Sequence, residues 1–182
     1  AYIVNYADDL VICCRGRAEE ALTMMRDLMR KLKLTVNETK TRVCKLPEET
    51  FDFLGYTFGR CYSLKTGRAY LGTVPSKKRV IRICETISEA TGRDQTLLDH
   101  EIVVAKLNRT IIGWANYFCL GPVSTAYRAV EQHARKRLLQ WLCAKHKLVW
   151  PAAQRFPETS LHEVLGLVCL TERTRNFPWA TS

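Results

Sequence analysis

Up to residue 75 the hydrophobic residues form short, β-prone runs, as in 2–6 and 10–13, or alternate with small residues at a period of two, as in 51–58, and both patterns predict β-strands. Strands are expected at residues 2–6, 10–13, 42–46 and 51–58 and in the two arms of a hairpin over 61–73. Apolar residues recur at helical spacing over 18–32, which predicts a helix there. Its apolar stripe contains Leu22, Met25, Leu28, Met29 and Leu32. We expect this stripe to cover one face of the sheet.

Beyond residue 75 the period changes to 3.6, which predicts amphipathic helices. They are expected at 76–90, 97–118 and 124–147. Pro75 and Ser76 mark the change, because proline interrupts a strand ladder and serine caps a helix. Helices joined by short connections form a small bundle.

The sequence therefore predicts an α+β fold, in which antiparallel β-hairpins with one covering helix are followed by a three-helix bundle. We place the hairpins in residues 1–74, the bundle in 75–148 and a less regular extension in 149–182. Within the extension we expect a short helix running into a strand over 161–170 and an aromatic plug at 176–179.

Two adjacent acidic residues, Asp8 and Asp9, lie at the tip of the first expected hairpin. Because the flanking runs are apolar, two carboxylates there would repel each other and lose hydration, and both would stay ionised only beside a cation. Oxygen ligands at a hairpin tip suit Mg²⁺, which keeps several waters and shares substrate phosphates with one or two carboxylates. Such a site can serve two-metal phosphoryl transfer. The alternative is an ordinary turn, since Asp tolerates turn geometry and caps its own backbone.

The charge of the chain points to a polyanionic partner. Its 182 residues have a formal net charge of +10 at pH 7, while the hydrophobic content of 47% is ordinary for a globular protein. Nucleic acid is the first candidate partner, and an anionic membrane surface is the second. No stretch approaches the roughly 18 apolar residues of a membrane span, and no signal peptide opens the chain. We therefore expect a soluble, cytoplasmic protein that does not act at a membrane.

Cationic side chains gather at the start of the first bundle helix and on one side of the last. They are Lys77, Lys78, Arg79, Arg128, Arg135 and Lys136. In the last helix only Glu131 interrupts them. These residues either form an ordinary solvated surface or neutralise the phosphates of an RNA or RNA–DNA duplex. The eight cysteines lie mostly inside apolar runs without a Cys-X-X-Cys pair, which indicates buried thiols and no zinc site or disulfide framework.

Two segments resemble active-site motifs of one enzyme family. Residues 6–9, Tyr-Ala-Asp-Asp, resemble the Tyr-X-Asp-Asp motif of reverse transcriptases, with Ala at the second position as in the group II intron branch. Residues 37–41, Asn-Glu-Thr-Lys-Thr, resemble the segment in which a Lys-Thr pair follows a turn beside the active site. The resemblance implies that Asp8 is a metal ligand and that Asp9 supports the metal or the hairpin. It also implies that Lys40 faces the triphosphate and neutralises or protonates the leaving pyrophosphate.

Two further segments continue the resemblance in the order typical of the family. Phe53, Leu54, Gly55 and Tyr56 resemble the primer grip, which holds the primer end against the metals. Residues 113–118, Gly-Trp-Ala-Asn-Tyr-Phe, strongly resemble the Gly-Trp-X-Asn-Tyr-Phe run of the group II intron maturase-specific domain. In a helix of the bundle, Gly113 would let another helix approach closely, Trp114 and Phe118 would fill the core, and Asn116 or Tyr117 would cap the helix or reach outward.

The resemblance implies the last palm motifs and the thumb of a group II intron reverse transcriptase and maturase. Such an enzyme copies an RNA template from a DNA primer with deoxynucleoside triphosphates and Mg²⁺, and it binds group II intron RNA to promote splicing and mobility. Because residue 1 already lies inside an expected strand, we expect a fragment that lacks the fingers and the earlier palm strand with its metal-binding Asp. Alone, it is expected to have little or no polymerase activity.

Two alternatives stay open. The first is an RNA-binding maturase module without polymerase activity, against which the intact Asp8 and Asp9 pair argues. The second is another Tyr-X-Asp-Asp polymerase, such as a retron-type or diversity-generating enzyme, which would not be expected to contain the run at 113–118.

Overall fold

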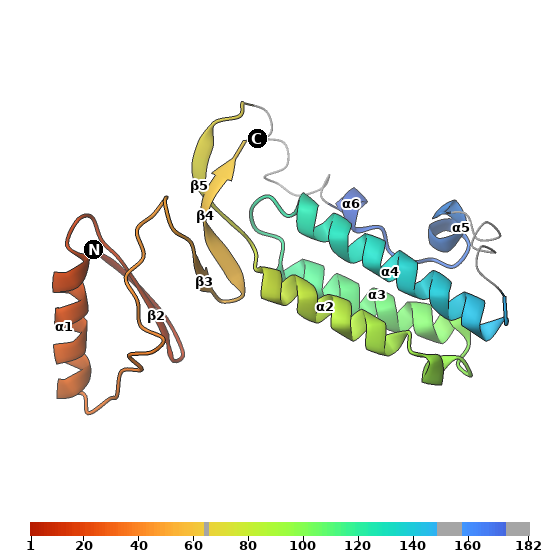
Figure 1. The fold of residues 1–182 in the computed structure, drawn as a ribbon, viewed down its shortest axis with the longest axis horizontal. Coiled ribbons are helices and arrows are strands. Elements are labelled where there is room, and N and C mark those ends of the chain that lie inside the picture. Colours follow the sequence, from red (N-terminus) through yellow and green to blue (C-terminus); the bar gives the residue numbers. More distant parts are fainter. Residues whose placement is uncertain (64–65, 149–157, 174–182) are drawn as a thin grey trace.

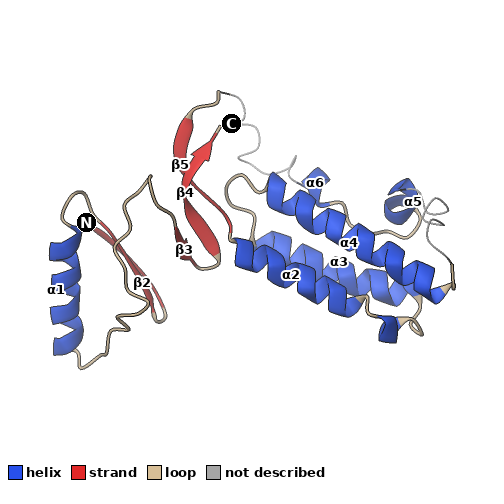
Figure 2. Cartoon of the chain, in the orientation of Figure 1, coloured by secondary structure: helices blue, strands red, loops and turns tan. Residues whose placement is uncertain are grey.

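The computed structural model describes residues 1–63, 66–148 and 158–173. The chain forms a hairpin with one helix, a three-stranded sheet and a helical bundle, and Figure 1 shows these parts in succession. The strands lie between the first helix and the remaining helices (Figure 2). This arrangement confirms the expected α+β fold. Among the described residues, no helix combines the length and the apolar character that crossing a membrane would require.

The first part is an antiparallel hairpin of β1 (Tyr2–Tyr6) and β2 (Asp9–Cys13), followed by helix α1 (Ala18–Lys31). Tyr6 pairs with Asp9, so a loop of two residues, Ala7 and Asp8, joins the strands. Ala7 has a φ of 49°. This left-handed conformation is unfavourable for a residue with a Cβ atom, and the hairpin imposes it because the loop is so short.

The apolar side chains of this first part are largely exposed. No described residue before Tyr56 is buried. On α1, Leu22, Met25 and Met29 are half-buried, whereas Leu28 and Leu32 are 52% and 57% exposed. The expected apolar stripe is therefore covered only in part.

The three-stranded sheet has the order β3 (Phe51–Phe53), β4 (Tyr56–Tyr62) and β5 (Ala69–Pro75), all antiparallel. The expected hairpin over 61–73 is confirmed, with longer arms. A continuous strand over 51–58 was expected, and this is wrong. Phe53 pairs with Tyr56, and Leu54 and Gly55 turn the chain with φ of 52° and 82°. Two positive φ angles in a two-residue loop are typical of hairpin turns whose twist matches that of the strands.

The strand expected over 42–46 does not form. Instead, the Lys45 amide donates a hydrogen bond to the Glu49 carboxylate, and the Glu49 amide donates to the Lys45 carbonyl. The Arg42 side chain donates to the carbonyl of Thr50. These local hydrogen bonds compete with pairing to another strand.

The bundle consists of α2 (Lys77–Ala90), α3 (His100–Tyr117) and α4 (Ser124–Lys145), with a short 3₁₀-helix, η1 (Arg93–Gln95), between the first two. The three expected helices are confirmed, and each α-helix contacts the other two. The bundle interior is lined by Ile83, Ile87, Val103, Val104, Leu107, Ile111, Ala115, Tyr127, Val130, Ala134, Leu138, Trp141 and Leu142, all buried. β5 ends at Pro75 and α2 begins at Lys77. The domain boundary expected at residues 74–75 stays a prediction.

The segment after the bundle contributes to the same core. It contains α5 (Glu158–Glu163) and α6 (Leu170–Arg173), so the strand expected within 161–170 does not form. Leu161, Leu167 and Leu170 are buried among the bundle residues. The Asn108 side chain on α3 donates to the Gly166 carbonyl at 2.7 Å and accepts from the Val168 amide at 2.8 Å. The aromatic plug expected at 176–179 lies outside the described residues.

The eight cysteines are free thiols. Cys143 is buried, Cys13 is exposed and the others are half-buried. The expectation of buried thiols is therefore wrong for most of them, because they lie in thinly covered strands and loops or, for Cys84, on a partly exposed side of α2.

Arg137 on α4 holds the C-terminal end of α2. Its guanidinium donates to the carbonyls of Ser88 and Thr91 at 3.0 and 2.9 Å and to the Thr91 hydroxyl at 3.1 Å. The last carbonyls of a helix have no partner inside the helix, and a positive charge is favourable at that end. Arg137 therefore stabilises the packing of α2 on α4.

We expect Arg137→Ala to lower the free energy of unfolding by about 2–3 kcal/mol, because hydrogen bonds from a charged group to part-buried carbonyls are lost. Urea unfolding followed by tryptophan fluorescence measures this change. Lys136→Ala, at the exposed neighbouring position, is the matched control and should change stability by less than about 0.5 kcal/mol. Equal losses in the two variants would contradict the assignment.

Candidate functional site

Asp8 and Asp9 lie at the tip of the β1–β2 hairpin and are both exposed. The expected dehydration of these carboxylates is wrong, because the apolar residues around them face solvent as well, with Tyr6 63% exposed. The two-residue loop presents Asp8, while Asp9 begins β2. The hairpin tip therefore offers two neighbouring, accessible carboxylates.

The donor chemistry of this tip fits Mg²⁺, which prefers oxygen ligands and needs only one or two carboxylates beside waters and phosphates. Within the described part of the chain, no group of three or more His, Cys, Asp or Glu residues is placed to hold a metal ion. Asp8 and Asp9 can thus supply part of a metal site. A full two-metal site needs further ligands.

Lys40 follows a turn organised by Asn37, as the sequence indicates. The Asn37 side-chain oxygen accepts from the Thr39 hydroxyl at 2.7 Å and from the Lys40 amide at 3.3 Å. The Lys40 side chain is exposed. In the described residues, no hydrogen bond or ion pair joins it to either Asp of the hairpin tip.

An ion pair that the sequence did not indicate holds this turn to α1. Arg26 donates from Nε and Nη2 to the two carboxylate oxygens of Glu38 at 3.0 and 2.6 Å. The hydrogen bond from Arg26 lowers the pKa of the Glu38 carboxyl, and the same contact raises the pKa of the Arg26 guanidinium. A bidentate pair of this kind fixes direction as well as distance. It therefore orients the turn that contains Lys40.

The β3–β4 turn, which contains the expected primer-grip residues, lies against the start of the bundle. The Gly55 carbonyl accepts from the Ser76 amide at 2.9 Å, and the Leu54 carbonyl accepts from the Tyr117 hydroxyl at 2.9 Å. A Cβ atom at Gly55 would lie only 3.0 Å from Arg79 Nε and 3.1 Å from Phe118 Cζ. Gly55 thus allows both the turn and its close approach to α2 and α3.

Aromatic rings fill the junction between this turn and the bundle. The ring centroid of Phe118 lies 5.1 Å from that of Tyr56 and 5.0 Å from that of Trp114, and Trp114 lies 5.9 Å from Tyr127. Burial raises the pKa of Tyr56, and it raises the pKa of Tyr127 to about 12. Both phenols therefore keep their protons at neutral pH. Tyr56 donates to the carbonyl of Tyr117, and Tyr127 donates to the carbonyl of Ala115 at 2.8 Å.

The run at 113–118 lies as expected except at one residue. Phe118 is buried, as predicted, and Trp114 packs against the core. The expectation that Gly113 receives a neighbouring helix is wrong. Gly113 is exposed, and a Cβ atom there would meet nothing within 4 Å. This glycine faces away from the bundle interior.

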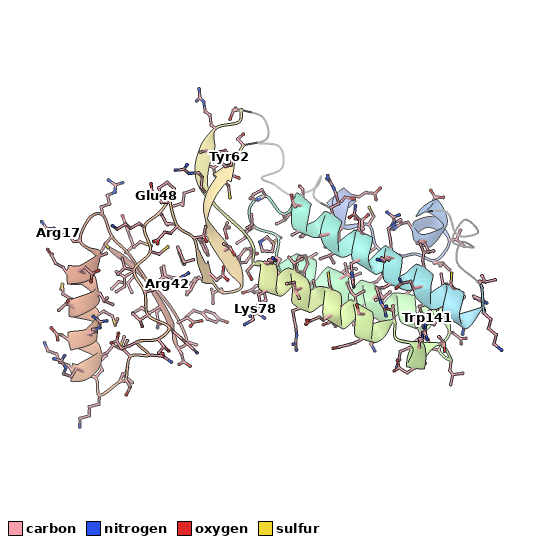
Figure 3. The ribbon with its side chains drawn as sticks, in the orientation of Figure 1. Arg17, Arg42, Glu48, Tyr62, Lys78 and Trp141 are labelled. Carbon is pink, nitrogen blue, oxygen red and sulfur yellow. The ribbon has the colours of Figure 1, made fainter. Side chains whose placement is uncertain are left out.

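The expected cationic residues divide into two groups. Lys77, Lys78, Arg79, Arg128 and Lys136 are exposed. Figure 3 shows Lys78 where α2 begins, next to the three-stranded sheet. The side chain of Arg79 lies over Gly55, so this end of α2 and the β3–β4 turn form one continuous surface.

Arg135 is half-buried, so its expected place on the outer face of α4 is wrong. It follows Glu131 by about one helical turn, and the Glu131 carboxylate accepts from the amides of Leu170 and Thr171 at 3.0 Å each. This side of α4 therefore faces the segment 158–173.

A second cation that the sequence did not single out also serves the fold. Lys145 donates to the carbonyls of Thr96 and Leu98 at 3.2 and 2.7 Å and lies over the Trp141 ring. Like Arg137, it binds part-buried backbone oxygens next to the end of a helix. A sequence cannot separate such lysines from solvated ones, because the distinction depends on tertiary contacts.

Two family models match the chain, and between them they cover most of the features described above. The model for reverse transcriptase (RNA-dependent DNA polymerase) matches residues 1–58, which include the Asp hairpin, the Asn37 turn and the β3–β4 turn. The model for the group II intron maturase-specific domain matches residues 80–156, which include most of α2 and all of α3 and α4. No match to an individual curated protein accompanies them. The chain therefore belongs to the group II intron reverse transcriptase and maturase family.

Proposed function

We propose that this chain acts within an RNA-directed DNA polymerase that also binds group II intron RNA and promotes its splicing and mobility. The observation that carries this proposal is the exposed Asp8 and Asp9 pair at a hairpin tip inside the reverse-transcriptase match. Nucleotidyl transfer needs carboxylates that a metal ion, a triphosphate and a primer end can all reach. An ordinary structural turn would not require two adjacent acids at its most accessible point.

The residues of the site have separate roles in this proposal. Asp8 would hold Mg²⁺ directly and Asp9 would support the ion or the hairpin. When bound, Mg²⁺ supplies charge stabilisation for phosphoryl transfer. Lys40, on the turn oriented by the Arg26–Glu38 pair, would neutralise or protonate the leaving pyrophosphate. Phe53, Leu54, Gly55 and Tyr56 would hold the primer end.

The exposed apolar surface of the first part supports a larger assembly around the site. Tyr2, Ile3, Tyr6 and Met24 are 82%, 65%, 63% and 73% exposed. So many exposed large apolar side chains in one hairpin and its helix favour a contact with another part of a protein. We propose that it packs against further reverse-transcriptase palm structure, which would also supply the missing metal ligands. The 182 residues alone would then have little or no polymerase activity.

The exposed cations support binding of RNA and of an RNA–DNA duplex. Lys77, Lys78 and Arg79 occupy the first turn of α2, which contains no acidic residue. Positive charge is unfavourable at a helix N-terminus, and a bound phosphate would offset that cost. Arg128 and Lys136 extend the positive charge along α4, whereas the half-buried Arg135 is left out of this interface. Contacts of this type neutralise phosphates without reading sequence.

In the complete polypeptide that contains these residues, we expect Asp8→Ala to reduce Mg²⁺-dependent primer extension at least about a hundredfold, because a ligand of the metal is lost. The affinity for group II intron RNA should stay within about twofold. Asp27→Ala, at an exposed position on α1, is the control and should extend primers normally. Undiminished extension by Asp8→Ala would contradict the proposed site, and splicing support without any extension by the unaltered protein would favour the maturase-only alternative.

The double variant Lys77→Ala/Lys78→Ala should bind intron RNA more weakly at low salt. It should also reduce the slope of log affinity against log salt concentration by about one to two, because up to two phosphate contacts are removed. Filter binding over a salt series measures both quantities. The matched control is Lys31→Ala/Lys45→Ala, which removes the same charge from exposed sites outside the bundle. Identical slopes for the two double variants would exclude a specific role for the start of α2.

A further inference from the structure

We propose that Tyr117 is a positioning residue for DNA synthesis: its hydroxyl holds the β3–β4 turn against the bundle and so sets where the primer end lies. The inference rests on the proposed function, in which this turn holds the primer. It deepens that function by assigning a role to Tyr117, whose side chain donates a hydrogen bond from the 113–118 run to the turn.

Two hydrogen bonds run in opposite directions between Tyr117 and the β3–β4 hairpin. The Tyr117 hydroxyl donates to the Leu54 carbonyl at 2.9 Å, and the Tyr56 hydroxyl donates to the Tyr117 carbonyl. The Gly55 carbonyl accepts from the Ser76 amide. Each carbonyl of the two-residue turn thus accepts a hydrogen bond: Leu54 from the Tyr117 side chain on α3, and Gly55 from the backbone of Ser76, which directly precedes α2. We call this set of three hydrogen bonds the turn latch.

The exposure of Tyr117 separates its role from packing. Tyr117 is 54% exposed, whereas the adjacent Phe118 is only 5% exposed and fills the junction between the sheet and the bundle. The ring of Tyr117 therefore contributes little to the core, and the main feature that Phe would lack at this position is the donor to Leu54. Removal of the hydroxyl should leave the bundle folded.

The conformation of the turn explains why it needs such a support. Leu54 has a φ of 52°, which is unfavourable for a residue with a branched side chain. Conformations of this kind cost about 1–3 kcal/mol and persist only where the surroundings determine them. The Tyr117 hydroxyl binds the carbonyl of that same residue. The latch therefore stabilises the one strained point of the segment that would touch the primer.

The consequence for catalysis follows from the geometry of nucleotide addition. The primer hydroxyl and the incoming phosphate must lie about 3–3.5 Å apart and in line, and small displacements are costly. A turn released from the bundle would still contact the primer but would hold it in more than one position. The rate of addition should fall, while the affinity for the primer–template should change little because the cations that bind phosphates are untouched.

The test compares Tyr117→Phe with Tyr127→Phe in the complete polypeptide. Tyr127 belongs to the same aromatic junction, but its hydroxyl donates to the carbonyl of Ala115, inside the bundle. We expect Tyr117→Phe to lower the single-turnover rate constant of nucleotide addition about two- to tenfold, as the loss of one hydrogen bond implies. The dissociation constant of the primer–template should stay within about twofold. Tyr127→Phe should leave both quantities within about twofold.

Hydrogen exchange at the Ser76 amide gives a second measurement that does not depend on catalysis. This amide precedes α2 and is protected by the Gly55 carbonyl, so loosening of the turn should accelerate its exchange in Tyr117→Phe and not in Tyr127→Phe. Unchanged exchange and unchanged addition in Tyr117→Phe would overturn the inference, as would equal effects of the two variants. If either of these outcomes is found while Asp8→Ala abolishes primer extension, the proposed function is retained and only the role of Tyr117 is rejected. If Asp8→Ala extends primers normally, both fall.

Discussion

The contact between the β3–β4 turn and the C-terminal end of α3 joins the two halves of this molecule, which are the strand-rich residues 1–75 and the helical bundle that follows them. The sheet contributes Tyr56 and the carbonyls of a strained turn, and the bundle contributes Tyr117, Phe118 and the start of α2. Because the hydrogen bonds run both ways, neither half can shift along the other without losing a donor and an acceptor together. Gly55 permits this approach, since a Cβ atom there would crowd Arg79 and Phe118.

Burial is distributed very unevenly on the two sides of this contact. The bundle has a continuous interior, from Ile83 to Leu170, in which the polar ends of helices are bound by side chains such as Arg137. The hairpin with Asp8 and Asp9 has no buried residue. The half that buries most of the apolar side chains is thus distinct from the half that presents the carboxylates. The turn at residues 54–55 lies between them.

Much of the bundle could be predicted from the sequence, because amphipathic periodicity survives wherever a helix buries one face. The turn within 51–58 was missed because the aromatic residues keep a spacing of two on each side of it, and its only sequence signals are the step of three from Phe53 to Tyr56 and the intervening Gly55. The predicted dehydration of Asp8 was wrong for a different reason. Apolar neighbours in the sequence indicate burial only if another part of the protein covers them. Whether Gly113 faces a neighbour, or Arg137 a carbonyl, depends on tertiary contacts that no local pattern records.

The three leucines that complete the bundle core come late in the chain. Leu161, Leu167 and Leu170 are buried in the core of the bundle, and Asn108 on α3 and Glu131 on α4 bind the backbone around them. During synthesis, these helices leave the ribosome before the residues that close their interior. The nascent bundle therefore keeps an open apolar seam until its last leucine emerges, and in that interval it is most exposed to aggregation and most dependent on chaperones.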